Sequence, residues 1–459
     1  MHHNATPNGQ LHGGFIISAT TSGVGKTTIS SALMRAFANM GLETQGAKVG
    51  PDYIDPQYHL LATGKPSYNL DPFIGGGPIG VKRTLSRLAA SDVVVVEGVM
   101  GLYDGTYLTP TTGPIDHEIH KINYASTAHV ATITKLPVVL LVDATATSMS
   151  LSATIEGFIS HSDLVEVKGV VVNKVGSKNH SMIIERALSQ LPIEVLGLIP
   201  RDRDLALPSR HLGLVQPLES EAQSNEMIER SSEIVSKYID IRALLSISRP
   251  LRSHAGKVAP SNLRLLRYAR APLVAVARGS AFEFTYHENL DILREHGAQI
   301  RFFDPLEEEF DQASTHLFLG GGYPELHMSK IAKNKALLRQ IKEFASDGGR
   351  IWAECGGHML LGKAIEHVDA VGVLPHTSHM SKSLHLGYRK VVAKRPNPLF
   401  DMEDIVPAHE YHYSTTIDDA SDLTFEGFNH RGSGGVSTDT IISSYMHFHL
   451  GGLLKYEDY

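Results

Sequence analysis

The single cysteine of the chain, Cys355, stands where an apolar run meets a pair of glycines. Residues 351–354 predict a strand that turns sharply into a helical stretch at residues 359–365. In such a turn the central side chain projects from the sheet beside the amides of the helix start, which lowers the pKa of a thiol and favours the thiolate. Most lone cysteines are small buried hydrophobes, but the flanking Gly356 and Gly357 favour a nucleophile.

A hydrolytic cysteine needs a general base and hydrogen-bond donors for an oxyanion. The triple-glycine run at residues 320–322 follows a predicted strand, and the amides of Gly321 and Gly322 are the candidate donors. His447 is the candidate base and His449 the alternative, because strand alternation places both imidazoles on one face.

A second glycine-rich segment, residues 19–28, follows an apolar strand and opens a helix, as a phosphate-binding loop does. Lys26 would reach the β- and γ-phosphates of ATP, and the Thr27 hydroxyl would hold Mg²⁺. Thr20 replaces the glycine of the strict pattern, so the loop is a variant. The candidate nucleotide-binding residues are Thr21, Ser22, Gly23, Gly25, Lys26, Thr27, Thr28 and, at a strand end where amides read a purine edge, Asn173.

Carboxylates at predicted strand ends are candidate metal and substrate ligands. Glu97 closes a run of four valines and would point into the crevice where ligands of parallel sheets bind. Asp52 and Asp55 follow another strand, although Asp beside Pro also caps turns. We expect Mg²⁺ at Thr27, Asp52 and Glu97.

Composition restricts the function classes. At 459 residues, two to four domains are expected. No apolar run is long enough for a transmembrane helix, and the polar N-terminus does not read as a secretory signal. One cysteine excludes an internal disulfide and agrees with a cytoplasmic location. The net charge of −7, without a basic block, argues against nucleic acid or membrane partners. Four histidines near the C-terminus lack the spacing of metal ligands.

Apolar strands alternate with amphipathic stretches in both halves, which predicts an α/β fold with buried parallel strands. Predicted strands in the first half are 14–19, 47–49, 93–96, 138–142, 169–172 and 195–199, with helices at 26–40 and 179–191. In the second half they are 273–277, 299–303, 316–319, 387–393 and 441–445, with helices at 288–296 and 329–346. We divide the chain into a disordered lead-in (1–12), a P-loop domain (13–245), a linker (246–270) and a second α/β domain (271–459).

Taken together, the motifs resemble the cobyrinate a,c-diamide synthases, glutamine-dependent amidotransferases of vitamin B12 synthesis. The matching segments include the phosphate loop, Lys48-Val49-Gly50-Pro51-Asp52-Tyr53-Ile54-Asp55-Pro56, residues 97–105, Pro208-Ser209-Arg210-His211, Ala353-Glu354-Cys355-Gly356-Gly357 and His409-Glu410-Tyr411-His412-Tyr413-Ser414. The match runs nearly end to end, and the segments at residues 50–56 and 409–414 are its most specific parts.

The resemblance implies a P-loop parallel-sheet domain followed by a class I-like glutamine amidotransferase domain. The first would use MgATP to convert the a and c acetate carboxylates of cobyrinate, a corrinoid, into acyl phosphates. The second would release ammonia from glutamine through a Cys355 thioester. Substrate-contacting positions implied by the family are Tyr53, Asp55, Asp104, Arg210 and His211. A homodimer is left open.

One departure concerns the third catalytic residue. Glutaminase relatives elsewhere place a glutamate two residues after the catalytic histidine, and His449 occupies that position here. The same motifs also fit hydrogenobyrinate or nickel-sirohydrochlorin as substrate. A partition-type ATPase switch would account for the phosphate loop but would leave Cys355 and His447 unexplained.

Overall fold

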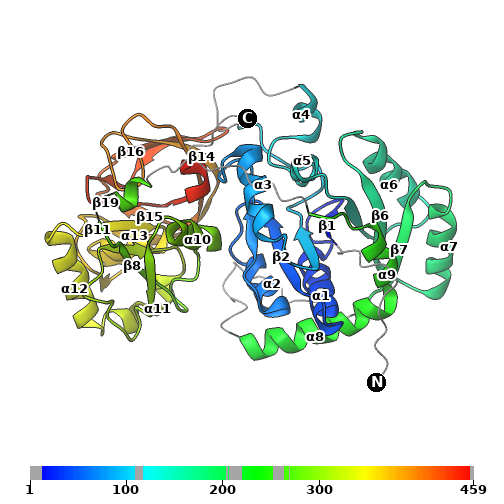
Figure 1. Ribbon diagram of the computed structural model, residues 1–459, viewed down its shortest axis with the longest axis horizontal. Helices are drawn as coiled ribbons and strands as arrows, with labels where there is room; N and C mark the ends of the chain where they lie inside the picture. The colour runs from blue at the N-terminus through cyan, green and yellow to red at the C-terminus, as the bar shows by residue number, and fades with distance from the viewer. Residues whose placement is uncertain are drawn as a thin grey trace. The chain divides into compact units, whose positions relative to one another are not determined.

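The computed structural model describes residues 13–108, 117–202, 205, 220–251, 263–267 and 269–454 (Figure 1). Contacts divide the chain into two compact units. The first contains residues up to 71, 81–106 and 114–255, and the second contains residues 72–80, 107–113 and 256 onward. Each unit is built around its own hydrophobic core.

The first unit contains a seven-stranded sheet in the order β3-β2-β4-β1-β5-β6-β7, with every pair parallel. The strands are β1 (Gly14–Ala19), β2 (Thr44–Val49), β3 (Tyr68–Leu70), β4 (Val93–Glu97), β5 (Val138–Asp143), β6 (Val167–Val175) and β7 (Glu194–Pro200). The four valines of β4 are fully buried, as expected of a parallel strand covered on both faces.

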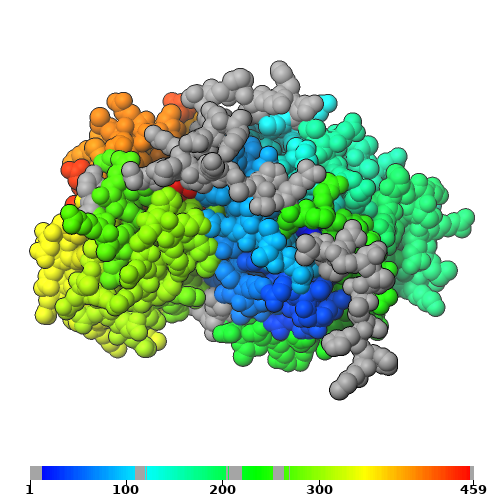
Figure 2. Space-filling model, viewed as in Figure 1, coloured from blue at the N-terminus to red at the C-terminus, as the bar shows by residue number. Residues whose placement is uncertain are grey.

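Helices connect these strands, and two more helices follow the last strand in the sequence. They are α1 (Lys26–Asn39), α2 (Asp55–Thr63), α3 (Gly77–Arg87), α4 (His117–Ile122), α5 (Thr127–Thr134), α6 (Leu151–Ser160), α7 (Lys178–Leu188), α8 (Glu221–Tyr238) and α9 (Ile241–Ile247). Helix α8 packs along α1, where the Arg35 guanidinium contacts Glu229 at 3.0 Å and Asn225 at 2.9 Å. Its green surface borders the blue surface of the first helices in Figure 2.

The second unit contains two sheets. The first has the order β18-β19-β11-β10-β8-β9 and is parallel except for the β18–β19 pair. Its strands are β8 (Leu273–Ala277), β9 (Gln299–Phe303), β10 (His316–Leu319), β11 (Arg350–Glu354), β18 (Val436–Ser437) and β19 (Ile441–Ser444). Its helical segments are η1 (Arg264–Leu266), α10 (His287–Glu295), α11 (Pro324–Ile331), α12 (Lys335–Ser346), α13 (Gly356–Leu361) and η2 (Leu450–Leu453).

The second sheet is built on a long antiparallel pair, β14 (Thr377–Ala393) and β15 (Val406–Ile417). It also contains β12 (Ala364–Ile365), β13 (Val368–Asp369), β16 (Leu423–Glu426), β17 (Arg431–Gly434) and β20 (Met446–Phe448). After β19 the chain leaves the first sheet, and it joins the second as β20, which pairs with β15. Residues 444–446 therefore carry the chain between the two sheets.

Most predicted strand positions are confirmed, with small differences at their ends, and four predicted elements differ more. The helix predicted at residues 329–346 is two helices, α11 and α12, because Asn334 caps a new helix by accepting from the Leu337 amide. The helix predicted to reach residue 191 ends at Leu188, and the one predicted at residues 359–365 is displaced toward Cys355 as α13. The strand predicted at 387–393 begins ten residues earlier.

We expect a buried histidine in β10 to make the stability of the second unit acid-sensitive. Burial lowers the pKa of His316 to about 4, against a partial opposing effect of its hydrogen bond to the Leu265 carbonyl. Between pH 4 and 6.5 the unfolded chain therefore binds a proton that the folded chain does not, so stability falls as pH falls through this window. At 1.36 kcal/mol per pKa unit, the loss between pH 6.5 and 5 is about 2 kcal/mol.

The variant His316→Gln can keep the hydrogen bond to Leu265 without titrating. Denaturant unfolding of both proteins at pH 7.5, 6 and 5 should show a smaller loss of stability on acidification in the variant. If both proteins lose the same amount of stability on acidification, His316 does not contribute to the acid sensitivity.

Candidate active sites

The predicted phosphate loop follows β1 and opens α1. Gly23 and Gly25 have φ values of 79° and 105°, which side-chain-bearing residues rarely adopt. The Asn173 side chain donates to the Val24 carbonyl at 2.9 Å, and a Cβ on Gly25 would lie 3.1 Å from that same nitrogen. Asn173 therefore supports the loop, and its predicted contact with a purine stays a prediction.

The other predicted nucleotide-binding residues of the phosphate loop differ in their exposure to solvent. Thr21, Ser22 and Gly23 are exposed, whereas Lys26 and Thr28 are buried. The Lys26 ammonium donates to the carbonyls of Met100, at 2.5 Å, and Thr21, at 3.4 Å.

A fully buried carboxylate, Glu97, joins the ends of three neighbouring strands. Register places it beside Ile17 of β1 and Lys48 of β2. Its Oε1 accepts from the Thr27 hydroxyl at 2.8 Å and lies 3.1 Å from the Lys48 ammonium. Its Oε2 lies 2.7 Å from Nε2 of His59. Glu97 thus links the phosphate loop to β2 and α2.

The charges at this site are strongly coupled. Burial alone would lower the pKa of Lys48, but Asp55, 2.8 Å from its ammonium, and Glu97 outweigh that effect and raise it far above its usual value. Burial lowers the pKa of Lys26 to about 8, and Lys48 adds to this effect. The phosphates of a bound nucleotide would reverse this penalty because they bring negative charge to the Lys26 ammonium.

The remaining predicted residues of this site lie in different surroundings. Oδ1 of Asp52 accepts from the amides of Ile54 and Asp55, so Asp52 caps the turn into α2. Turn capping was the alternative to its metal role, and that role stays a prediction. Asp55, like Glu97, is paired with Lys48.

Two further substrate positions can be placed. Asp104 is exposed, with its Oδ2 accepting from the Gly101 amide, and Tyr53 is half-buried in the turn before α2. Arg210 and His211 lie outside the described residues. The sequence analysis missed His59, because a histidine inside an amphipathic helix gives no signal of a buried partner.

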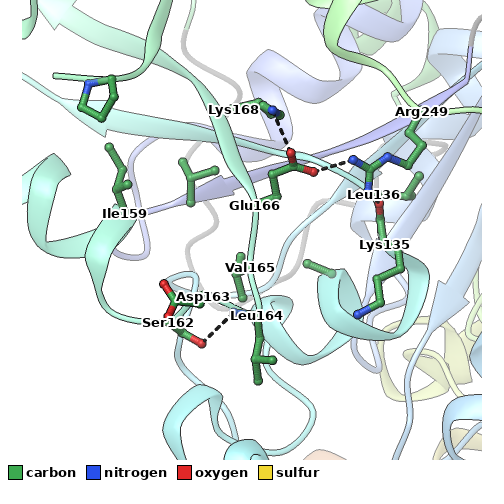
Figure 3. Close-up of a pocket in the computed structure, with 13 residues that line it drawn as sticks. Lys135, Leu136, Ile159, Ser162, Asp163, Leu164, Val165, Glu166, Lys168 and Arg249 are labelled. Carbon is green, nitrogen blue, oxygen red and sulfur yellow. Dashed lines mark hydrogen bonds and ion pairs between the residues drawn. The ribbon is translucent and has the colours of Figure 1, made fainter.

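A cavity of about 550 Å³ opens at the other end of the sheet, beside the first residues of β5 and β6 (Figure 3). The Glu166 carboxylate there lies between Lys168 at 2.7 Å and Arg249 at 2.5 Å. Because the phosphate loop follows the opposite end of β1, this cavity is separate from the nucleotide site.

In the second unit, the predicted nucleophile lies in a sharp turn between β11 and α13. Cys355 is the N-cap residue of α13, with φ 48° and ψ −104°, a conformation rarely adopted by non-glycine residues. A Cβ on Gly357 would lie 2.1 Å from the Leu319 carbonyl oxygen, and one on Gly356 would lie 2.8 Å from Pro324. Both flanking glycines are therefore required by close packing against β10 and α11.

The triple-glycine loop follows β10, the strand next to β11. The Gly321 amide donates to the Phe284 carbonyl at 3.1 Å, so it is not available as an oxyanion donor. A Cβ on Gly321 would lie 2.6 Å from Cε1 of His447, and one on Gly356 would lie 3.2 Å from the Gly322 amide nitrogen. The loop thus lies between His447 and the start of α13, and Gly322 is the donor that we retain.

Each candidate base faces a buried glutamate. Nδ1 of His447 lies 3.4 Å from Oε2 of Glu354, and Nε2 of His449 lies 3.5 Å from Oε2 of Glu288. Oε1 of Glu354 accepts from the Trp352 indole at 2.8 Å and from the Phe448 amide at 2.7 Å, which fixes this carboxylate. Glu354 was missed from the sequence because it precedes the nucleophile instead of following the base.

The expected low thiol pKa is wrong for this structure. Burial raises the pKa of Cys355 far above its usual value, and the neighbouring Glu325, Glu354 and Glu410 carboxylates add to the increase, against a smaller effect of the Gly356 amide. Burial also raises the pKa of Glu325 to about 7. With its pKa raised in this way, the thiol is protonated near neutral pH.

Comparisons with known proteins match both units. Residues 15–215 match the family model described as CobQ/CobB/MinD/ParA nucleotide binding domain, and residues 273–453 match CobB/CobQ-like glutamine amidotransferase domain. Among the helices in the described ranges, none combines the length and apolar character needed to cross a bilayer.

Curated relatives match almost the whole chain. The cobyrinate a,c-diamide synthase of Clostridium acetobutylicum is 36% identical over 96% of this chain and 98% of its own. The hydrogenobyrinate a,c-diamide synthase of Brucella suis biovar 1 is 37% identical over 95% and 98%, and that of Mycobacterium tuberculosis is 35% identical over 86% and 85%. With a nucleotide-binding unit, a glutamine amidotransferase unit and relatives that share both, the chain belongs to the family of cobyrinate and hydrogenobyrinate a,c-diamide synthases.

Proposed function

We propose that this enzyme uses ATP and glutamine to amidate the a and c acetate carboxylates of cobyrinate. The observation that carries the proposal is the presence, in one chain, of a lysine-bearing phosphate loop and of a cysteine in a strained turn beside a histidine–glutamate pair. The substrate is taken from the relatives, and hydrogenobyrinate and nickel-sirohydrochlorin are the alternatives. A nucleotide switch without chemistry would have no use for the second site.

In the glutaminase reaction, His447 would take the proton of Cys355, whose pKa is raised by burial. The sulfur would then attack the side-chain amide carbon of glutamine, and the Gly322 amide would donate to the oxyanion. His447 would return the proton to the departing ammonia, leaving a thioester. Water would hydrolyse that thioester to glutamate and restore the thiol.

In the synthetase reaction, an acetate carboxylate oxygen would attack the γ-phosphorus of ATP, releasing ADP and forming an acyl phosphate. Ammonia would then attack the acyl carbon and displace phosphate, giving the amide. Each amide therefore consumes one ATP and one glutamine. Lys26 would stabilise negative charge on the transferred phosphoryl group.

Thr27 and Glu97 present hydroxyl and carboxylate oxygens within 2.8 Å of each other, a donor set that suits Mg²⁺. These two residues would hold the ion. When bound, Mg²⁺ would neutralise charge on the phosphates.

Glu354 is the residue that we assign to orienting His447. The variant Glu354→Gln should lower the kcat of glutamine hydrolysis by about 100-fold while leaving KM nearly unchanged, because the base loses the carboxylate that fixes it. Steady-state glutaminase assays measure both constants.

The matched control is Glu288→Gln, which removes the carboxylate facing His449 and should leave kcat within about threefold of wild type. A larger loss from Glu288→Gln than from Glu354→Gln would instead make His449 the base.

The proposed function is tested by incubating the protein with MgATP, glutamine and each of the three macrocycles, and by counting added amides with mass spectrometry. Two amides on cobyrinate support the proposal. Two amides on another macrocycle only would keep the mechanism and change the substrate. ATP hydrolysis accompanied by neither an amidated product nor glutamine hydrolysis would overturn the proposal.

A further inference from the structure

Two fully buried imidazoles outside the proposed catalytic machinery each have one ring nitrogen that bonds to nothing in the described part of the chain. His358 lies in α13, three residues after Cys355, and His376 directly precedes β14. Nε2 of His358 and Nδ1 of His376 are buried, and neither makes a hydrogen bond to any residue that the structure describes. Burying such a polar atom without a partner costs about 1–3 kcal/mol, so a metal ion or a water molecule bound at these nitrogens would stabilise the fold.

The third member of this group is Asp419, which follows β15. One ligand atom of each of the three side chains lies within 4.8 Å of the other two. The rings of His358 and His376 lie 4.1 Å apart between centroids, and the Asp419 charge acts on His376. We call these three residues the His358–His376–Asp419 cluster.

The opposite nitrogen of each imidazole is already held by the protein. Nδ1 of His358 lies 2.8 Å from the Ser443 hydroxyl, and Nε2 of His376 lies 3.0 Å from the His358 carbonyl oxygen. Since only a protonated Nε2 can donate to that carbonyl, Nδ1 of His376 carries the lone pair in the neutral ring. Metal-bound histidines are held in this way, with the second nitrogen bonded to a carbonyl or hydroxyl group.

The protonation state also suits a metal. Burial lowers the pKa of both imidazoles, and His376 adds to this effect on His358, so both rings are neutral near pH 7. Oδ1 of Asp419 accepts from the Ala420 amide and Oδ2 from the Gly435 amide, which orients the carboxylate without using all of its lone pairs. Neutral imidazole and carboxylate are the protonation states that bind metal ions.

An entry path is present. Asp419 is only half-buried and lines a cavity of about 260 Å³ together with Ser414 and Tyr445. Two imidazoles and one carboxylate form a ligand set typical of zinc and related divalent transition metals, with the fourth position left to water. We propose that the His358–His376–Asp419 cluster binds one such ion, zinc in the first instance.

A neighbouring group, His385, Glu410 and His412, also has metal-ligand chemistry. Its Glu410 carboxylate, however, is paired with the Arg389 guanidinium at 2.6 Å and with His412 at 2.9 Å. A cation there would have to displace an arginine. This group is therefore the internal comparison and not a second proposal.

The ion would join three separate parts of the second unit. His358 belongs to the helix that begins at Cys355, His376 to the start of the long hairpin, and Asp419 to the turn after that hairpin. Binding would therefore hold the nucleophile helix against the second sheet. This role is structural and independent of the macrocycle and of ATP.

The test uses the purified full chain, stripped with a chelator and then titrated with Zn²⁺ alone in a competing chelator buffer. Bound metal is counted by elemental mass spectrometry, and thermal unfolding is followed in parallel. We expect one zinc per chain and a higher unfolding temperature with Zn²⁺. Because cysteine also binds zinc, the titration is repeated with Cys355→Ser, which should bind zinc as wild type does.

The variants His376→Gln and Asp419→Asn should each weaken zinc binding at least tenfold, and the matched control His385→Gln should not. Should the ligand variants fail to fold, two wild-type measurements still test the proposal: the number of zinc ions bound per chain and the change in unfolding temperature on adding Zn²⁺. No tight zinc in the stripped and titrated wild type would overturn the proposal. Loss of zinc in His385→Gln alone, or in Cys355→Ser alone, would overturn it too.

Discussion

Replacing Cys355 with serine is expected to lower glutamine-dependent amidation at least about 1,000-fold, because the thioester can no longer form at a useful rate. Amidation with ammonium as the nitrogen source should remain within about threefold of wild type, since the phosphate loop of the first unit is unchanged. Product amides are counted by mass spectrometry with either nitrogen source.

Serine and cysteine have similar volumes, so we do not expect an altered protein structure to explain the loss. Circular dichroism and thermal unfolding of Cys355→Ser check this directly. Equal losses with glutamine and ammonium, in a folded variant, would mean that Cys355 serves the synthetase reaction instead.

Replacing Lys26 with methionine is expected to produce the opposite pattern. Amidation should fall at least about 100-fold with either nitrogen source, because the transferred phosphoryl group loses its charged partner. Glutamine hydrolysis measured without ATP should stay near the wild-type rate.

Stability should fall little in Lys26→Met. Lys26 is buried, and its pKa of about 8 shows that its charge is held at a cost in the free protein. The variant removes that cost and keeps most of the apolar stem. Normal amidation by Lys26→Met would show that the loop does not bind the reacting phosphates.

The fold of the first unit could be predicted closely from the sequence, because the patterns that indicate its strands and its phosphate loop are local. Four consecutive valines before Glu97 indicate a strand covered on both faces, and the glycines before Lys26 allow the loop. What the sequence could not show is the pairing of side chains across strands. His59 is 38 residues from Glu97 in sequence, and nothing in its own surroundings predicts the 2.7 Å contact.

The second unit was harder to predict for two reasons. The first half of β14 alternates exposed polar residues and lacks the apolar pattern of a strand, although it pairs with β15 through a register shift between Met380 and His385. The break between α11 and α12 contains no glycine or proline and depends on a capping asparagine, Asn334. Both features are decided by tertiary pairing and capping instead of by periodicity.

The sheet change at Tyr445 has a consequence for how this enzyme loses activity. Cys355 follows β11, a strand of one sheet, while His447 belongs to β20 of the other. The proposed glutaminase pair therefore requires that the two sheets remain packed. A loosening of the β14–β15 hairpin would separate His447 from Cys355 without unfolding the parallel sheet. We therefore expect ammonia release to be lost before the parallel sheet of the second unit unfolds.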